Sequence, residues 1–145
     1  MHTVQAIVPG IMQAGSFDGT PMQLRQAVLD QITTYPETHD QRDWVGDCGT
    51  TACVAGWALM FQLGYLPWGS WEILVEAQRL LGLSDYDAVR LFHFTSNEQA
   101  RLALKFLTNG DPVDWDAVGY KDGRHSKPQW EILIQQHLNQ YRTSM

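Results

Sequence analysis

Apolar residues recur every three to four positions along most of the chain, which is the spacing of amphipathic α-helices. The first such segment opens at Thr20, with Pro21 at the first helical position, and stops at the turn-rich segment TYPETHD, residues 34–40. Elsewhere a serine able to cap a helix precedes an apolar stripe. This pattern predicts helices over 70–81, 84–92, 96–109 and 126–141, with one short helical turn around 113–118.

The one strand candidate, Thr3–Val8, stands too far from any other to make a sheet. The sequence therefore predicts an all-α fold, a single compact domain of about five to six helices. We divide it into an N-terminal extension (1–20), a motif-bearing helical core (21–110), and a turn-rich segment with a C-terminal helix (111–145). In the last helix His137 falls on the apolar stripe, where we expect a hydrogen-bonded core histidine.

A run of small and apolar residues, GDCGTTACVAGWALMFQLG, occupies residues 46–64. Thr50 or Thr51 can cap a helix there, and Gly64 can end it, so we expect a helix over about Thr51–Leu63. The helix is apolar on almost every side, which is typical of a central, buried helix. Within it we expect close packing at Gly56 and Trp57. The structural motif comprises Cys48, Gly49, Thr50, Cys53, Gly56 and Trp57.

The two cysteines of this motif also allow a catalytic interpretation, because a thiol at a helix N-terminus has a lowered pKa. The pattern CGTTACVAGW superficially resembles the papain-type signature CG-(S/A)-C-(W/Y). Two extra residues separate the cysteines here, and the chain encodes no sheet to present the partner histidine. The candidate nucleophiles are Cys48 and Cys53, and the candidate bases are His39, His93 and His125.

A metal site is a weaker interpretation of the same residues. The C-x4-C spacing suits zinc and His39 lies upstream, but no second ligand pair completes a four-ligand set. We predict no metal and no cofactor. The polar cluster of Asp40, Arg42, Asp43 and Asp47 ahead of the motif is typical of a solvated, helix-capping loop, with a polar site as the alternative.

The net charge of −6 and the scattered basic residues offer no continuous track for a phosphate backbone, so we expect no nucleic acid partner. The local basic cluster at 120–127 is typical of a solvated loop. No apolar run reaches the ~18 residues of a membrane span, and the first residues lack the features of a signal peptide. We therefore expect a cytoplasmic protein with reduced cysteines that does not associate with a membrane.

Residues 22–94 resemble a family of small uncharacterised bacterial and phage proteins. Their shared pattern is a helix ending near a proline, a tryptophan, CGT-x-x-C-(I/V)-AG-(W/H)-A, then LGL and A-x-x-LF. The matching residues are Trp44, Cys48, Gly49, Thr50, Cys53, Val54, Ala55, Gly56, Trp57, Ala58, Leu81, Gly82, Leu83, Ala88, Leu91 and Phe92. The resemblance implies a bacterial or phage origin and an intracellular setting, and it brings no activity with it.

Two functions from different classes follow. The first is a small non-enzymatic binding or adaptor protein, in the phage case an accessory factor acting on a host protein. Its candidate interface residues are Trp68, Trp71 and Trp115, which we expect to be partly exposed, Trp115 while tucking against the core. The second is a small cysteine-dependent hydrolase or transferase using Cys48 or Cys53. The sequence defines no oligomeric state.

Overall fold

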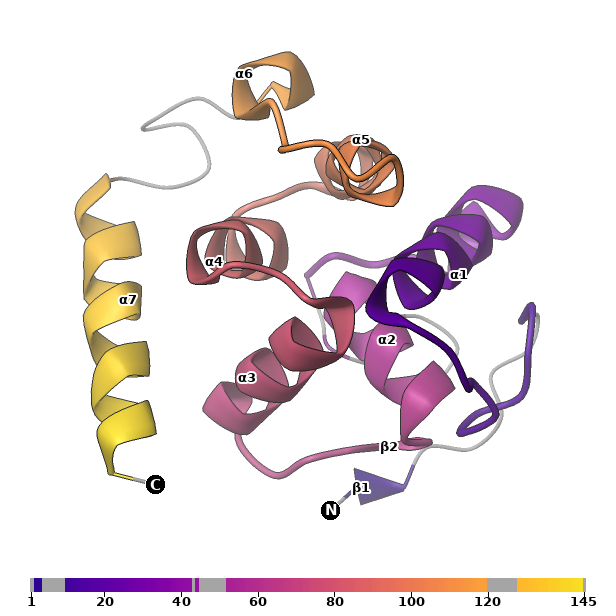
Figure 1. Ribbon diagram of the computed structural model, residues 1–145, viewed down its shortest axis with the longest axis horizontal. Coiled ribbons are helices and arrows are strands. Elements are labelled where there is room, and N and C mark those ends of the chain that lie inside the picture. Colours follow the sequence, from indigo (N-terminus) through magenta and orange to yellow (C-terminus); the bar gives the residue numbers. More distant parts are fainter. Residues whose placement is uncertain (1, 4–9, 43, 45–51, 120–127, 145) are drawn as a thin grey trace.

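The computed structural model describes residues 2–3, 10–42, 44, 52–119 and 128–144, and these residues are mostly helical. In chain order they form β1 (His2–Thr3), α1 (Pro21–Thr34), the 3-10 helix η1 (Pro36–Thr38), α2 (Val54–Gln62), β2 (Tyr65–Leu66), α3 (Ser70–Leu81), α4 (Asp85–His93), α5 (Asn97–Thr108), α6 (Trp115–Val118) and α7 (Pro128–Thr143). The predicted all-α fold class is confirmed. Figure 1 shows α2 between α1 and α3, with α7 along the side of α4.

Most helix ends follow the capping rules on which the predictions rest. Thr20 and Gln23 form a capping box at α1, with bonds of 3.2 and 2.9 Å, and Ser96 forms the same box at α5. Ser84 caps α4, and Gly82 ends α3 in the left-handed conformation at φ 66°. The start of α3 differs: Gly69 holds the cap position and Ser70 is already helical.

The central helix begins later than predicted. We expected it to start near Thr51, yet α2 starts at Val54 and Cys53 is its N-cap, with extended backbone at ψ 177°. The reason lies outside the helix, because Ala52 pairs with the segment around His39: its N–H donates to the Thr38 carbonyl and its own carbonyl accepts from the Asp40 N–H, both at 3.0 Å. The expected burial is confirmed, since every residue from Val54 to Phe61 is buried.

A single arginine joins helices α1, α3 and α5. Arg25 of α1 donates from Nε to the Leu81 carbonyl at 2.7 Å and from Nη2 to the Gly82 carbonyl at 2.8 Å. Its Nη1 reaches the Leu107 carbonyl, 3.2 Å away. These carbonyls lie at the C-terminal ends of α3 and α5, where helical carbonyls have no partner of their own. Arg25 thereby fixes the position of α1 on both helices.

The chain forms a short antiparallel ladder, although we expected its strand candidate to stay isolated. His2 pairs with Leu66, and Thr3 pairs with Tyr65. Residues 4–9, the rest of the predicted strand, lie outside the described residues. The ladder joins His2 and Thr3 to the segment between α2 and α3.

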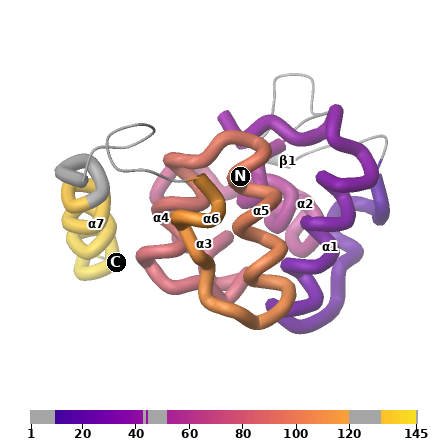
Figure 2. Tube along the Cα trace, turned by 90° about the horizontal axis from the view of Figure 1, so that it is seen from above, coloured from indigo at the N-terminus to yellow at the C-terminus, as the bar shows by residue number. Residues whose placement is uncertain are grey.

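Helix α7 lies at the edge of the molecule beside α4, in both Figure 1 and Figure 2. Of its predicted apolar stripe, Leu138 is fully buried, while Leu133 is 43% exposed. His137 is exposed as well, against our expectation of a core histidine, and its ring meets the edge of Trp71 at 6.2 Å. Polar contacts hold much of the helix instead, as Arg142 bonds Asp85 at 2.7 Å.

Candidate functional site

The buried cysteine of the motif serves as a helix cap. Its Sγ accepts a hydrogen bond from the Gly56 N–H at 3.4 Å, and Cys53 is 1% exposed. The first N–H groups of a helix lack partners within it, and the thiol satisfies one of them. Cys53 therefore lies before the helix rather than inside it.

Gly56 and Trp57 fill the space beside this cap, as the packing interpretation predicts. A Cβ on Gly56 would lie 1.7 Å from the carbonyl oxygen of Trp44, so only glycine fits. The close neighbour is thus the backbone of the preceding loop. Trp57 is buried, and its Nε1 donates to the Thr38 carbonyl at 3.1 Å.

The buried amide of Gln41 connects the loop to the start of α2. Its Nε2 donates to the Leu91 carbonyl at 2.7 Å, and its Oε1 accepts from the Val54 N–H at 3.2 Å. Because these backbone partners fix which amide atom is the oxygen, the His39 Nε2, 2.8 Å from Oε1, must carry a proton. The tautomer of His39 is therefore defined by the network.

Burial disfavours the protonated form of this histidine. Desolvation lowers the pKa of His39, and it outweighs the opposing effects of the Gln41 hydrogen bond and the nearby charge of Asp40. Asn97 completes the network from α5: its Nδ2 donates to the His39 carbonyl at 2.8 Å and its Oδ1 accepts from the Gln41 N–H at 2.7 Å.

Two cavities open on the outer side of this network. One, of about 470 Å³, is lined by His39 and Asn97, and the other, of about 410 Å³, by Trp44 and His93; they share Gln41, Arg42 and Thr95. Cys53 lines neither cavity. The structure thus brings two of the candidate bases to neighbouring cavities and places the described candidate nucleophile elsewhere.

Two side chains at these cavities have perturbed acidities. Desolvation lowers the pKa of His93, whose ring meets the edge of Trp44 at 5.8 Å. Hydrogen bonds from Arg42 lower the pKa of Asp40, and the two side chains form an ion pair at 3.0 Å with Arg42 largely exposed. Of the predicted polar cluster, these two residues make a solvated loop pair, and Asp43 and Asp47 lie outside the described residues.

The three candidate interface tryptophans differ in exposure. Trp68 is 67% exposed, and Trp71 is half-buried. Trp115 is buried at 7%, and its Nε1 donates to the Asp87 carboxylate at 3.1 Å. The expectation that Trp115 is partly exposed is wrong, because the short helix α6 folds it onto α4 and the core.

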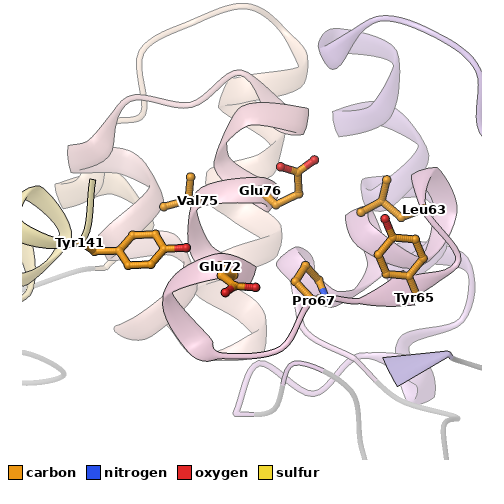
Figure 3. Close-up of a pocket in the computed structure, with 7 residues that line it drawn as sticks. All are labelled: Leu63, Tyr65, Pro67, Glu72, Val75, Glu76 and Tyr141. Carbon is orange, nitrogen blue, oxygen red and sulfur yellow. The ribbon is translucent and has the colours of Figure 1, made fainter. Parts of the chain in front are cut away.

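An open groove of about 350 Å³ is lined in part by Pro67, the residue before the exposed Trp68. Figure 3 shows Glu72, Val75 and Glu76 along one face of α3, with Tyr141 of α7 at one end. The other end is formed by the segment that leads from α2 through β2. We call this the α3 groove, and it is lined by Leu63, Tyr65, Pro67, Glu72, Val75, Glu76 and Tyr141.

Several predicted site residues cannot be placed. Cys48, Gly49, Thr50 and His125 lie outside the described residues. The sequence analysis in turn missed Gln41, Asn97 and the residues of the α3 groove. No local signal marks them, because each acquires its role from partners far away in the chain.

Comparison with models of known protein families, with curated proteins and with solved structures finds no match to this chain. The resemblance to small bacterial and phage proteins stays a prediction. Within the described ranges, no group of three or more His, Cys, Asp and Glu side chains is arranged to hold a metal ion. None of the helices in the described part of the chain has the length and apolar character that crossing a membrane requires.

Proposed function

We propose that the protein is a non-enzymatic binding protein that attaches to a protein partner through the surface at the start of α3. The observation that carries this proposal is the exposure of Trp68, which is 67% exposed and directly follows Pro67, a residue that lines the α3 groove. Tryptophan is enriched among the residues that dominate binding energies at protein interfaces. A tryptophan left this exposed has apolar surface available for such a contact.

The alternative, a cysteine-dependent hydrolase or transferase, has less support from the described residues. A nucleophilic thiol must be reachable by its substrate and by a base. Cys53 is 1% exposed and accepts the Gly56 N–H, and the Nε2 of His39 is bonded to Gln41. These contacts favour a structural role for both side chains.

The partner that we propose is a protein rather than nucleic acid, because the chain has a net charge of −6. We place the interaction in the cytoplasm. For a phage-encoded member of the family that the sequence resembles, the partner is a host protein.

Affinity capture from a bacterial lysate, compared between variants, tests the proposal. We expect the parent chain to retain a stoichiometric protein that Trp68→Ala loses. Tyr86→Ala is the matched control, because Tyr86 is an aromatic residue of α4 that is 53% exposed. Retention by Trp68→Ala equal to that of the parent and of the control, or no retained protein at all, would contradict the proposal.

A further inference from the structure

We propose that the α3 groove seats an arginine side chain of the partner, so that the bound segment of that protein is basic. This inference deepens the proposed function and rests on it. It names the chemistry of the partner at the position next to Trp68. The lining of the groove, its unpaired charge and its shape carry the argument.

The groove has two carboxylates and no cationic residue in its lining. Glu72 is exposed, and among the described residues no cation lies within ion-pair distance of it. Glu76 is paired with Arg79, whose Nε donates to Oε2 at 3.2 Å and whose Nη2 donates to Oε1. Arg79 lies mostly in solvent, with its side chain 66% exposed, so a guest cation can share or replace it. A cation entering the groove meets the available carboxylate of Glu72 and the carboxylate of Glu76, which a solvent-exposed arginine holds.

The remaining lining suits a long side chain that is apolar along its stem. Leu63, Pro67 and Val75 add apolar surface to the groove. Figure 3 shows Pro67 and Leu63 on the Tyr65 side of the two acids and Val75 on the Tyr141 side. The methylene groups of arginine and lysine cover such surface while the charged end reaches polar groups. Tyr65 and Tyr141 add phenol rings, whose faces attract cations. Arginine suits both features better than lysine, because its planar guanidinium stacks on rings and binds carboxylates with two parallel hydrogen bonds.

Other occupants fit the groove less well. An anionic segment would meet the two glutamates and the negative net charge of the chain. A purely apolar helix would take those carboxylates out of water without a compensating partner, which is unfavourable. Glu72 lies in the first turn of α3, where a negative charge also interacts favourably with the helix dipole. That interaction alone does not account for the tyrosines and the apolar residues that line the groove.

Titration with N-acetyl-arginine amide, followed by backbone NMR of the full chain, tests this inference. We expect saturable shifts at residues 63–67, 72–76 and 141, with a millimolar Kd suited to a single side chain. The matched probe is N-acetyl-citrulline amide, which has nearly the same shape without the charge. We expect it to bind at least about fivefold more weakly, as the loss of one charged contact predicts.

Three variants sharpen the test. Glu72→Gln should weaken binding of the arginine probe about fivefold, and Arg79→Gln should strengthen it by freeing Glu76. Glu98→Gln is the matched control, because Glu98 pairs with Arg101 on α5 in the same i,i+3 arrangement as Glu76 with Arg79. It should leave binding unchanged.

Equal binding of the two probes, shifts outside the groove only, or an unchanged Kd in Glu72→Gln would overturn the inference. The outcome is separable from that of the proposed function. If the groove rejects the arginine probe while Trp68→Ala still loses the captured protein, the inference fails and the proposed function stands. If the groove binds the probe but no captured protein depends on Trp68, the proposed function fails and the groove's preference for arginine stands.

Discussion

The start of α2 and the start of α3 contrast in how they use their polar and aromatic residues. At α2, Gln41 and Cys53 are buried, and their polar atoms bond the backbone of the helix start. At α3, Trp68 is exposed and Glu72 has no ion-pair partner among the described residues. The described residues of the cysteine motif, Cys53, Gly56 and Trp57, therefore all make contacts that stabilise the fold. The surface at the start of α3, where Trp68 and Glu72 are exposed, carries no recognisable sequence motif.

The largest effect should come from the glycine of the motif. Gly56→Leu should prevent folding or cost about 3 kcal/mol or more, because the first added atom would lie 1.7 Å from the Trp44 carbonyl. Gly69→Ala at the start of α3 should cost less, about 1 to 3 kcal/mol, since its Cβ meets nothing within 4 Å and the cost comes only from the backbone conformation at φ +92°. Urea unfolding monitored by circular dichroism compares the two. Similar losses of stability would remove the contrast between the two regions.

Substituting one tryptophan in each region compares how much each contributes to the free energy of unfolding. Trp57→Ala should cost about 3 to 5 kcal/mol, as large aromatic truncations in cores do. Trp57→Phe keeps most of the volume and should cost less, about 1 to 3 kcal/mol. It loses part of the ring and the hydrogen bond to the Thr38 carbonyl, which still accepts the Ala52 N–H. Trp68→Ala should change stability by less than about 0.5 kcal/mol, because Trp68 lies mostly in solvent. A strongly destabilised Trp68→Ala variant would show that Trp68 serves the fold rather than binding.

Acid should lower the free energy of unfolding of the protein through the buried His39 near the start of α2. The pKa of His39 is lowered in the folded chain, so the unfolded chain binds the proton more readily. Stability should fall as the pH drops below about 6.5, with a limit of about 1.4 kcal/mol per pH unit for one proton. His93 acts in the same direction, since its pKa is lowered too.

Unfolding free energies at pH 7.5, 6.5 and 5.5 measure this dependence. His39→Gln, which cannot titrate in this range, should show a smaller loss between pH 6.5 and 5.5 than the parent. A slope in His39→Gln as steep as that of the parent would assign the acid sensitivity to other groups.

Substitutions of the cysteines should change stability only modestly. Cys53→Ala removes a small buried side chain and a weak cap, so we expect a folded protein destabilised by about 1 kcal/mol. Cys48→Ser should be milder still. Both variants should keep the capture that depends on Trp68. A Cys48→Ser variant with unchanged melting temperature and abolished cellular activity would instead support the cysteine-dependent enzyme.

Reactivity toward a thiol reagent tests the burial of Cys53. Because Cys53 is 1% exposed, a thiol reagent should modify it only after unfolding. Modification of Cys53 in the native protein at the rate of an exposed thiol would contradict the burial on which its structural role depends.

The sequence by itself determined the helices whose ends depend on neighbouring residues. The capping boxes of Thr20 with Gln23 and Ser96 with Gln99 join positions three apart, so a short stretch of chain contains both partners. Apolar spacing likewise marks α2 as buried. Such features are visible in the sequence because the helix itself brings positions three and four apart together.

Only the tertiary structure decided where α2 begins, which face α7 buries and what lines the α3 groove. Gln41 meets Val54 and Leu91, 13 and 50 residues away, and the groove takes residues from positions 63 to 141. Contacts at these separations form when the packed helices close long loops, and no local pattern specifies them. Cys53 shows the consequence most clearly, because the pairing of Ala52 with the segment around His39 moved it from inside the predicted helix to its cap.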